Sequence, residues 1–214
     1  MCIRDSYQVV RFLDANGVDL IARRDRVWET GPLAQRMVAA LDVAQANIPP
    51  YLRLLEQEAS DRLKTVHLAQ ACFWVGEMEL GQVDGVVTTE AAFMGGREIT
   101  TVRYDPEAIS LTELVTSAIE RGVADTVFVD KHGRDELAAV NVHASEVDMA
   151  SHRVAPRSDQ KRQIRSRRST RGLTDAQLTK LNAFARSAPA TAERFLGRDR
   201  PKQTEPVQPS DVFQ

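Results

Sequence analysis

The central part of the chain alternates apolar and polar positions in a pattern that predicts strands separated by helices. In chain order, the predicted elements are a strand over 64–71, a helix over 73–82, strands over 85–89 and 97–106, a helix that opens at the capping box Ser110-Leu111-Thr112-Glu113, and a strand over 127–129. This order, strand–helix–strand–strand–helix–strand, is typical of an α+β protein with a split βαββαβ, ferredoxin-like sheet whose helices lie on one face.

Residues 1–50 carry a different pattern. Two β-rich runs flank Asn16-Gly17, a pair that accepts positive φ at both positions, so we expect a β-hairpin there. A Thr-Gly-Pro motif at 30–32 precedes an apolar helical face that ends at Pro49-Pro50. A hairpin with one helix is marginal in water, and this arrangement resembles the C-terminal part of a thioredoxin-like domain. We therefore expect the end of such a domain, with residues 1–6 as a sequence artefact.

The remaining segments are set apart by their composition. Residues 51–63 are predicted to be a charged helical connector to the main domain, residues 64–145. In the next segment, 146–200, a basic stretch and a helix are expected, and eight basic side chains face one acid between residues 153 and 171. Because this stretch has no interleaved aromatic residues, a solvated or partner-facing surface is favoured over nucleic-acid binding. Residues 201–214 are rich in Pro, Gln and Ser and are predicted to be disordered.

Composition narrows the classes of function. The net charge of -2 argues against a nucleic acid or a membrane surface as the main partner, and no apolar run reaches the roughly 20 residues that span a bilayer. A reducing cytoplasm is therefore expected. The cysteines, Cys2 and Cys72, are too few for a disulfide framework or a zinc site, and the histidines show no metal spacing. We expect no metal and no cofactor.

Cys72 stands where the first strand of the main domain gives way to a helix. The amides and the dipole at a helix N-terminus favour a thiolate at this position. Phe73 and Trp74 follow directly and are able to wall an apolar pocket for a methyl-bearing ligand. The other interpretation is a buried cysteine that acts as a small apolar residue. The residues alone leave both interpretations open.

Three motifs around Cys72 occur in an order known from one family. They are CFWVGE from residue 72, GVVTTEAAFMGG from residue 85 and E-x5-YDPEAIS from residue 98. These motifs resemble the A-type peptide methionine sulfoxide reductases. The resemblance implies that Cys72 attacks the sulfoxide sulfur and becomes a sulfenic acid, with Glu98 as an acid kept neutral by burial. It also implies that Phe73, Trp74 and Phe93 bind the substrate.

Several positions depart from the family pattern. Phe93 replaces a tyrosine, and Arg97 alone stands where the family has a longer loop before Glu98. Glu77 is interpreted as a solvated helix residue. No cysteine follows Cys72, so thioredoxin or another thiol must reduce a sulfenate. The expected function is reduction of methionine S-sulfoxide, free or peptidyl, at reduced efficiency; the alternative is a non-catalytic redox-sensing or partner-binding module of the same fold.

Overall fold

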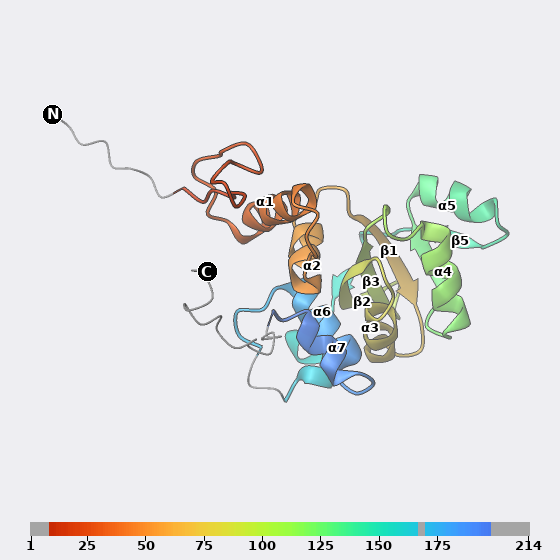
Figure 1. The fold of residues 1–214 in the computed structure, drawn as a ribbon. Helices are drawn as coiled ribbons and strands as arrows, with labels where there is room; N and C mark the ends of the chain where they lie inside the picture. Colours follow the sequence, from red (N-terminus) through yellow and green to blue (C-terminus); the bar gives the residue numbers. More distant parts are fainter. Residues whose placement is uncertain (1–8, 167–169, 198–214) are drawn as a thin grey trace.

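The protein, seen in a computed structural model, is a mixed α+β fold around a six-stranded sheet (Figure 1). The structure describes residues 9–166 and 170–197. The strands lie in the order β5-β4-β1-β3-β2-β6. Their bounds are Lys64–Ala69 for β1, Val86–Met94 for β2, Arg97–Tyr104 for β3, Thr126–Val129 for β4, Ala144–Glu146 for β5 and Arg153–Val154 for β6. The expected α+β class is confirmed.

From β1 to β4, the elements follow the predicted order. Helix α3 (Phe73–Gly81) joins β1 to β2, and helix α4 (Leu111–Glu120) joins β3 to β4. Strand β1 pairs antiparallel with β3 and β4, and β2 pairs antiparallel with β3. The predicted capping box opens α4: the Ser110 side chain accepts the N–H of Glu113, whose carboxylate accepts the N–H of Ser110. Local pattern therefore located these elements correctly.

The main apolar core lies between the sheet and helices α3 and α4. Leu68 of β1, Leu80 of α3 and Leu114 of α4 are fully buried there. Burial of one sheet face and one stripe on each helix explains why apolar residues alternate in the strands and recur every three or four residues in the helices. Each such side chain contributes about 1.5–3 kcal/mol to folding.

A two-residue turn joins β2 to β3 and places their ends beside α3. Gly95 and Gly96 have φ of 57° and 78°, and both angles lie in the left-handed region that favours glycine. Met94 pairs with Arg97 and Phe93 pairs with Glu98 across the turn. The short connection that the sequence shows before Glu98 is thus a tight hairpin.

The predicted N-terminal β-hairpin is wrong. Residues 9–29 contain a turn at Asn16-Gly17 and one isolated bridge, between Leu13 and Asp19, in place of two strands. The Asp14 carboxylate accepts two backbone N–H groups of the turn, which stabilises the turn locally. No strand among the described residues extends this bridge into a sheet, and an isolated two-stranded ribbon is marginal in water.

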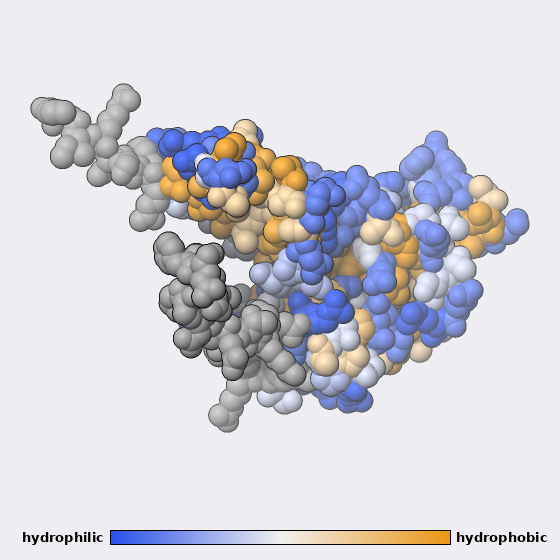
Figure 2. Space-filling view, in the orientation of Figure 1, coloured by the Kyte–Doolittle hydropathy of each residue, from blue (hydrophilic) through white to orange (hydrophobic). Residues whose placement is uncertain are grey.

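Helices α1 (Thr30–Val43) and α2 (Pro50–Glu58) occupy the part of the chain before β1. Helix α1 begins at the predicted Thr-Gly-Pro motif, and α2 begins next to the predicted helical connector. The two helices pack against each other through an apolar cluster. Apolar residues also reach the surface around α1 (Figure 2), where Trp28 and Val43 are more than half exposed. The thioredoxin-like assignment of residues 1–50 stays a prediction, and residues 1–6 lie outside the described part.

After β4 the chain adds further elements to the same sheet and core. Helix α5 (Lys131–Ala138) precedes β5, and β6 then pairs with β2. Helix α6 (Asp175–Phe184) packs against α3 and β2, and α7 (Pro189–Arg194) packs against α6 (Figure 1). None of the described helices combines the length and apolar character needed to cross a membrane. The predicted disordered tail, 201–214, lies outside the described residues.

Candidate active site

Cys72 lies at the junction between strand β1 and helix α3. It is the N-cap residue of α3, with extended backbone (φ −151°, ψ 111°), and its thiol is free and half-buried. The first amides of a helix have no partner within the helix, and its dipole is positive at this end. The residue therefore occupies the strand-to-helix junction that the sequence pattern predicted for it.

The Glu98 side chain reaches the same helix end from strand β3. Its Oε2 accepts the backbone N–H of Phe73 at 2.9 Å, and its backbone carbonyl accepts the N–H of Gln70 at 3.3 Å. A carboxyl group at a helix N-terminus gains from both the amide and the dipole. These contacts fall on either side of Cys72 in the chain, so the structure holds the Glu98 carboxyl group at the start of α3, next to residue 72.

Aromatic rings adjoin this pair. Phe73 is buried, and its ring meets that of Phe93 edge-on at a centroid distance of 5.5 Å. The Trp74 ring lies 5.8 Å from that of Phe73. Phe93 is the register partner of Glu98, so their side chains project from the same face of the sheet. The structure thus brings together the residues that the sequence assigned to the site, while their chemical roles stay predictions.

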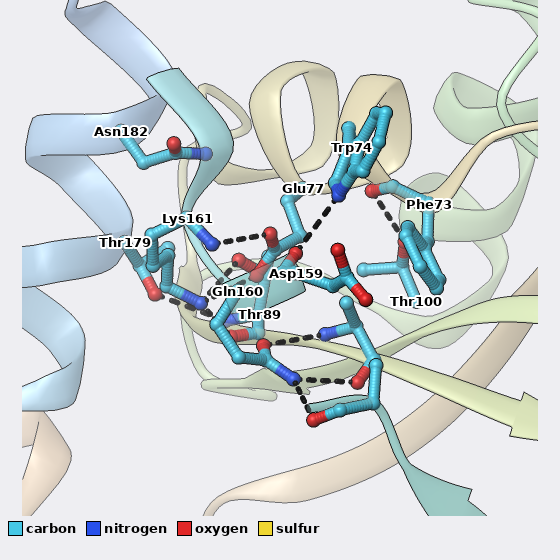
Figure 3. Close-up of polar contacts among 12 residues, drawn as sticks. Phe73, Trp74, Glu77, Thr89, Thr100, Asp159, Gln160, Lys161, Thr179 and Asn182 are labelled. Atoms are coloured by element: carbon cyan, nitrogen blue, oxygen red, sulfur yellow. Dashed lines mark hydrogen bonds and ion pairs between the residues drawn. The ribbon is translucent and has the colours of Figure 1, made fainter. Parts of the chain in front are cut away.

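Part of the basic stretch covers these rings. We call residues 153–164 the covering segment. The Trp74 indole N–H donates to the backbone carbonyl of Asp159 at 2.9 Å (Figure 3). The guanidinium carbon of Arg162 lies 4.6 Å from the centre of the Trp74 ring. The described arginines of the basic stretch are exposed, as the sequence interpretation expected, while its backbone and Lys161 pack on the site.

Strand β6 and Gln160 fasten the covering segment to β2. Arg153 pairs with Phe93 in the sheet, and its guanidinium carbon lies 5.3 Å from the centre of the Phe93 ring. The Gln160 side chain accepts the N–H of Ala91 at 2.9 Å and donates to the carbonyl of the same residue at 2.8 Å (Figure 3). The Gln160 side-chain amide thus makes the two hydrogen bonds to Ala91 that a paired strand would make, beyond the end of β6.

Glu77 was interpreted as solvated, and this is wrong. Its side chain is completely buried. Its Oε1 accepts from the ammonium of Lys161 at 2.7 Å and its Oε2 accepts the backbone N–H of Lys161 at 2.8 Å (Figure 3). The ammonium also donates to the Thr89 carbonyl. One signal was present: Phe73, Gly76, Glu77 and Leu80 follow helical spacing, so Glu77 lies on the buried stripe of α3.

A second polar cluster lies on the opposite face of the sheet. The Nδ1 of His67 is 2.9 Å from the Thr101 hydroxyl, and the rings of His67 and His152 are 5.3 Å apart. Burial, followed by the charge of His152, lowers the pKa of His67 to about 4. Sequence spacing assigned no site to these histidines. Within 9–166 and 170–197, no group of three His, Cys, Asp or Glu side chains is arranged to hold a metal ion.

Two cavities lie away from Cys72. One, of about 360 Å³, is lined by His67 and Tyr104 among others. The other, of about 410 Å³, is lined by Glu90, Arg103 and Lys161 among others. Neither cavity is lined by Cys72 or Glu98. The apolar pocket expected beside Cys72 is thus not formed by either of these cavities.

Comparison with known proteins points to one enzyme family. No family model matches the chain. A peptide methionine sulfoxide reductase, MsrA, of Clostridium perfringens is 31% identical over 90 residues, covering 34% of this chain and 56% of the relative. The MsrA of Campylobacter jejuni is 27% identical over 88 residues, covering 34% of this chain and 52% of the relative. The chain thus spans about half the length of the curated relatives it matches.

One solved structure is also similar. The methionine sulfoxide reductase A of Corynebacterium diphtheriae has 18% sequence identity and a TM-score of 0.40. The similarity covers 61% of this chain and 90% of that chain.

Proposed function

We propose that this chain, which contains an MsrA-like domain, reduces methionine S-sulfoxide, free or within a peptide, at Cys72. The observation that carries the proposal is the hydrogen bond from the Phe73 N–H to Glu98, which holds a carboxyl group beside the cysteine at the start of α3. The curated relatives support the substrate class. The finer assignment to a ferredoxin-like fold belongs to the same proposal and is supported by the strand order β4-β1-β3-β2.

The proposed reaction transfers one oxygen atom. The Cys72 sulfur attacks the sulfoxide sulfur, the substrate sulfur–oxygen bond breaks, and the oxygen ends on Cys72 as a sulfenic acid while a thioether leaves. The thiol supplies the hydrogen of the sulfenic acid and the sulfoxide supplies its oxygen. Glu98, when protonated, donates a hydrogen bond to the sulfoxide oxygen. The rings of Phe73, Trp74 and Phe93 contact the substrate methyl group.

The proposed activity is slower than that of the complete family site. Phe93 has no hydroxyl, and the Gly95-Gly96 turn replaces the longer loop of the family pattern. Each lost donor to the sulfoxide oxygen costs on the order of 10- to 1000-fold in rate, if it acts as an oxyanion donor does.

The second half-reaction needs an external thiol. The only cysteines of the chain are Cys2 and Cys72, and none follows Cys72 to form an internal disulfide. The proposed reductant is therefore thioredoxin or another thiol, which attacks the sulfenate sulfur and releases water. A thioredoxin-like part in residues 1–50 and a reducing cytoplasmic setting fit this reaction and belong to the proposal.

Single-turnover chemistry tests the function without a choice of reductant. The Cys2→Ser protein, reduced and freed of thiols, is mixed with methionine S-sulfoxide, and both methionine and the protein mass are measured. We expect one equivalent of methionine and an increase in mass by one oxygen atom, and neither in Cys2→Ser/Cys72→Ser. The R-sulfoxide serves as the matched substrate control. Equal background in both proteins would refute the proposal.

One observation favours a second candidate function. The covering segment already contacts Trp74 and Phe93, as a partner or a substrate would. A non-catalytic MsrA-like module for redox sensing or partner binding would form the sulfenate with peroxide yet release no methionine from the sulfoxide. Peroxide treatment of the same proteins separates this candidate from the reductase.

A further inference from the structure

We propose that Arg153 and Arg162 form an anion subsite beside Cys72, which takes a carboxylate of the small molecule that reacts with the cysteine. This inference rests on the proposed function for the identity of the reaction. The recognition of an anion by these two guanidinium groups, which stack on the Phe93 and Trp74 rings, is tested separately below.

Sheet register places Arg153 in line with the site. Glu98 pairs with Phe93 across β3 and β2, and Phe93 pairs with Arg153 across β2 and β6. Residues directly opposite in antiparallel strands project to the same face, so these side chains form one row at the end of the sheet where α3 begins. The guanidinium of Arg153 lies over the Phe93 ring, 5.3 Å from its centre. The Arg153 guanidinium thus lies against the ring that the proposed substrate contacts.

Arg162 contacts a second ring of the same cluster. Its guanidinium carbon is 4.6 Å from the centre of the Trp74 ring. The residues before it are held in place: the Asp159 carbonyl accepts the Trp74 N–H, and Lys161 is bound to the buried Glu77. The position of Arg162 is thus set by contacts inside the protein, and its guanidinium faces solvent.

Both guanidinium groups keep their donors available. None of the ion pairs among the described residues includes Arg153 or Arg162. Stacking over a ring uses the face of a guanidinium and leaves the N–H groups at its edge free. Two acidic residues of the site make other contacts. The Glu98 carboxyl group accepts the Phe73 N–H, and the Asp159 backbone carbonyl accepts the Trp74 indole N–H.

The chemistry of the reaction indicates which anion fits. Guanidinium groups recognise carboxylates with two parallel hydrogen bonds. Carboxylates come to Cys72 from two sources in the proposed cycle: a thiol reductant that carries them, as glutathione does, and free methionine sulfoxide. A peptide with a blocked C-terminus brings none. The subsite therefore favours small anionic reactants over neutral ones.

The first experiment does not depend on reductase activity. In the Cys2→Ser background, Cys72 reacts with an aromatic disulfide that carries a carboxylate on each ring, or with cystamine, which carries ammonium groups. In each reaction the Cys72 sulfur bonds to one sulfur of the probe, the probe disulfide breaks, and one thiolate leaves as the thiol proton passes to the buffer. The readout is a ratio measured at low salt: the second-order rate constant of the carboxylate probe divided by that of cystamine.

We expect Arg153→Gln and Arg162→Gln each to lower this ratio by about threefold, the size of an exposed charge contact. Salt should reduce the ratio of the parent in the same direction. Arg165→Gln is the matched control, because Arg165 is an exposed cation just beyond the covering segment, and it should leave the ratio unchanged. Arg153→Lys keeps the charge but loses the paired donors, and it should retain only part of the preference. A ratio that does not change in either Gln variant overturns the subsite.

Two further arms identify the source of the carboxylate. Preformed sulfenate is reduced with glutathione or with a neutral monothiol, and sulfenate formation is followed with free methionine S-sulfoxide or its N-acetyl amide. If the Arg variants lose the preference for glutathione over the neutral thiol, the subsite serves the reductant. If they lose the preference for free methionine S-sulfoxide over its N-acetyl amide, the subsite serves the substrate. A probe effect with no change in either arm overturns the proposal. If no variant releases methionine yet the probe ratio and the glutathione arm both respond, the proposed function fails and the anion subsite stands.

Discussion

Lys161 holds Glu77 through two bonds from different parts of one residue. Its backbone N–H donates to Oε2 at 2.8 Å, and its ammonium donates to Oε1 at 2.7 Å. Glu77 is completely buried on α3, the helix that begins next to Cys72. This pair therefore fastens the covering segment to the helix on which the proposed chemistry depends.

Replacing Lys161 with Met would leave the buried Glu77 carboxylate without its cation. Removing one partner of a buried pair costs about 3–5 kcal/mol, so we expect the free energy of unfolding to fall by roughly 3 kcal/mol in urea titrations. The Glu77→Gln/Lys161→Met double variant should recover part of this loss because it removes the charge. Arg165→Met, at an exposed position, should change stability by less than about 0.5 kcal/mol. If Lys161→Met and Arg165→Met lowered the free energy of unfolding equally, Lys161 would not be the stabilising partner of Glu77.

Glu98→Gln tests the carboxyl group beside the thiol. The amide keeps an oxygen that is able to accept the Phe73 N–H but cannot transfer a proton, so we expect sulfenate formation from methionine S-sulfoxide to slow by about 100-fold. Alkylation of Cys72 by iodoacetamide should continue, which shows that the thiol stays accessible. Glu90→Gln is the matched control on β2, since Glu90 pairs with Thr101 and projects from the face of the sheet opposite to Glu98. A Glu98→Gln protein with the parent rate would remove the acid from the mechanism.

Phe93→Tyr should return a hydroxyl to the site. Phe93 lies beside Phe73 and pairs with Glu98. We therefore expect the added oxygen to come close to the proposed sulfoxide oxygen. We expect single-turnover sulfenate formation to rise by about tenfold, the lower end of what one oxyanion donor contributes. Phe93→Leu keeps an apolar side chain without a ring and should not accelerate the reaction. An unchanged rate in Phe93→Tyr would show that this position does not face the oxygen.

His67 makes the stability depend on pH below neutrality. Burial and His152 lower its pKa from the ordinary 6.5 to about 4. Above pH 6.5 the ring is neutral in both the folded and the unfolded chain; between pH 6.5 and 4 only the unfolded chain binds the proton, so stability falls as the pH drops. We expect a loss of roughly 2–3 kcal/mol across this range, measured by urea titration.

His67→Gln should remove that part of the pH dependence. His132→Gln changes an exposed histidine and should retain the slope of the parent. Parallel slopes in the parent and His67→Gln would show that another group titrates.

Local sequence pattern was sufficient for much of the fold. Alternation and helical spacing located β1, α3 and α4, and the capping box at Ser110 and Glu113 is formed as predicted. The same pattern put Cys72 at a helix N-terminus. The hairpin at Asn16-Gly17 failed because a favourable turn is a local property, while strands also need neighbours with which to pair.

The sequence by itself determined which residues alternate, where helices begin and which motifs surround Cys72, because those features depend on neighbours within a few positions. Only the tertiary structure decided that Glu77 is buried, that Lys161 neutralises it from 84 positions away, and that the covering segment lies on the rings. A charge enters a protein interior only with a partner, and the periodicity of one helix does not encode where in the chain that partner lies.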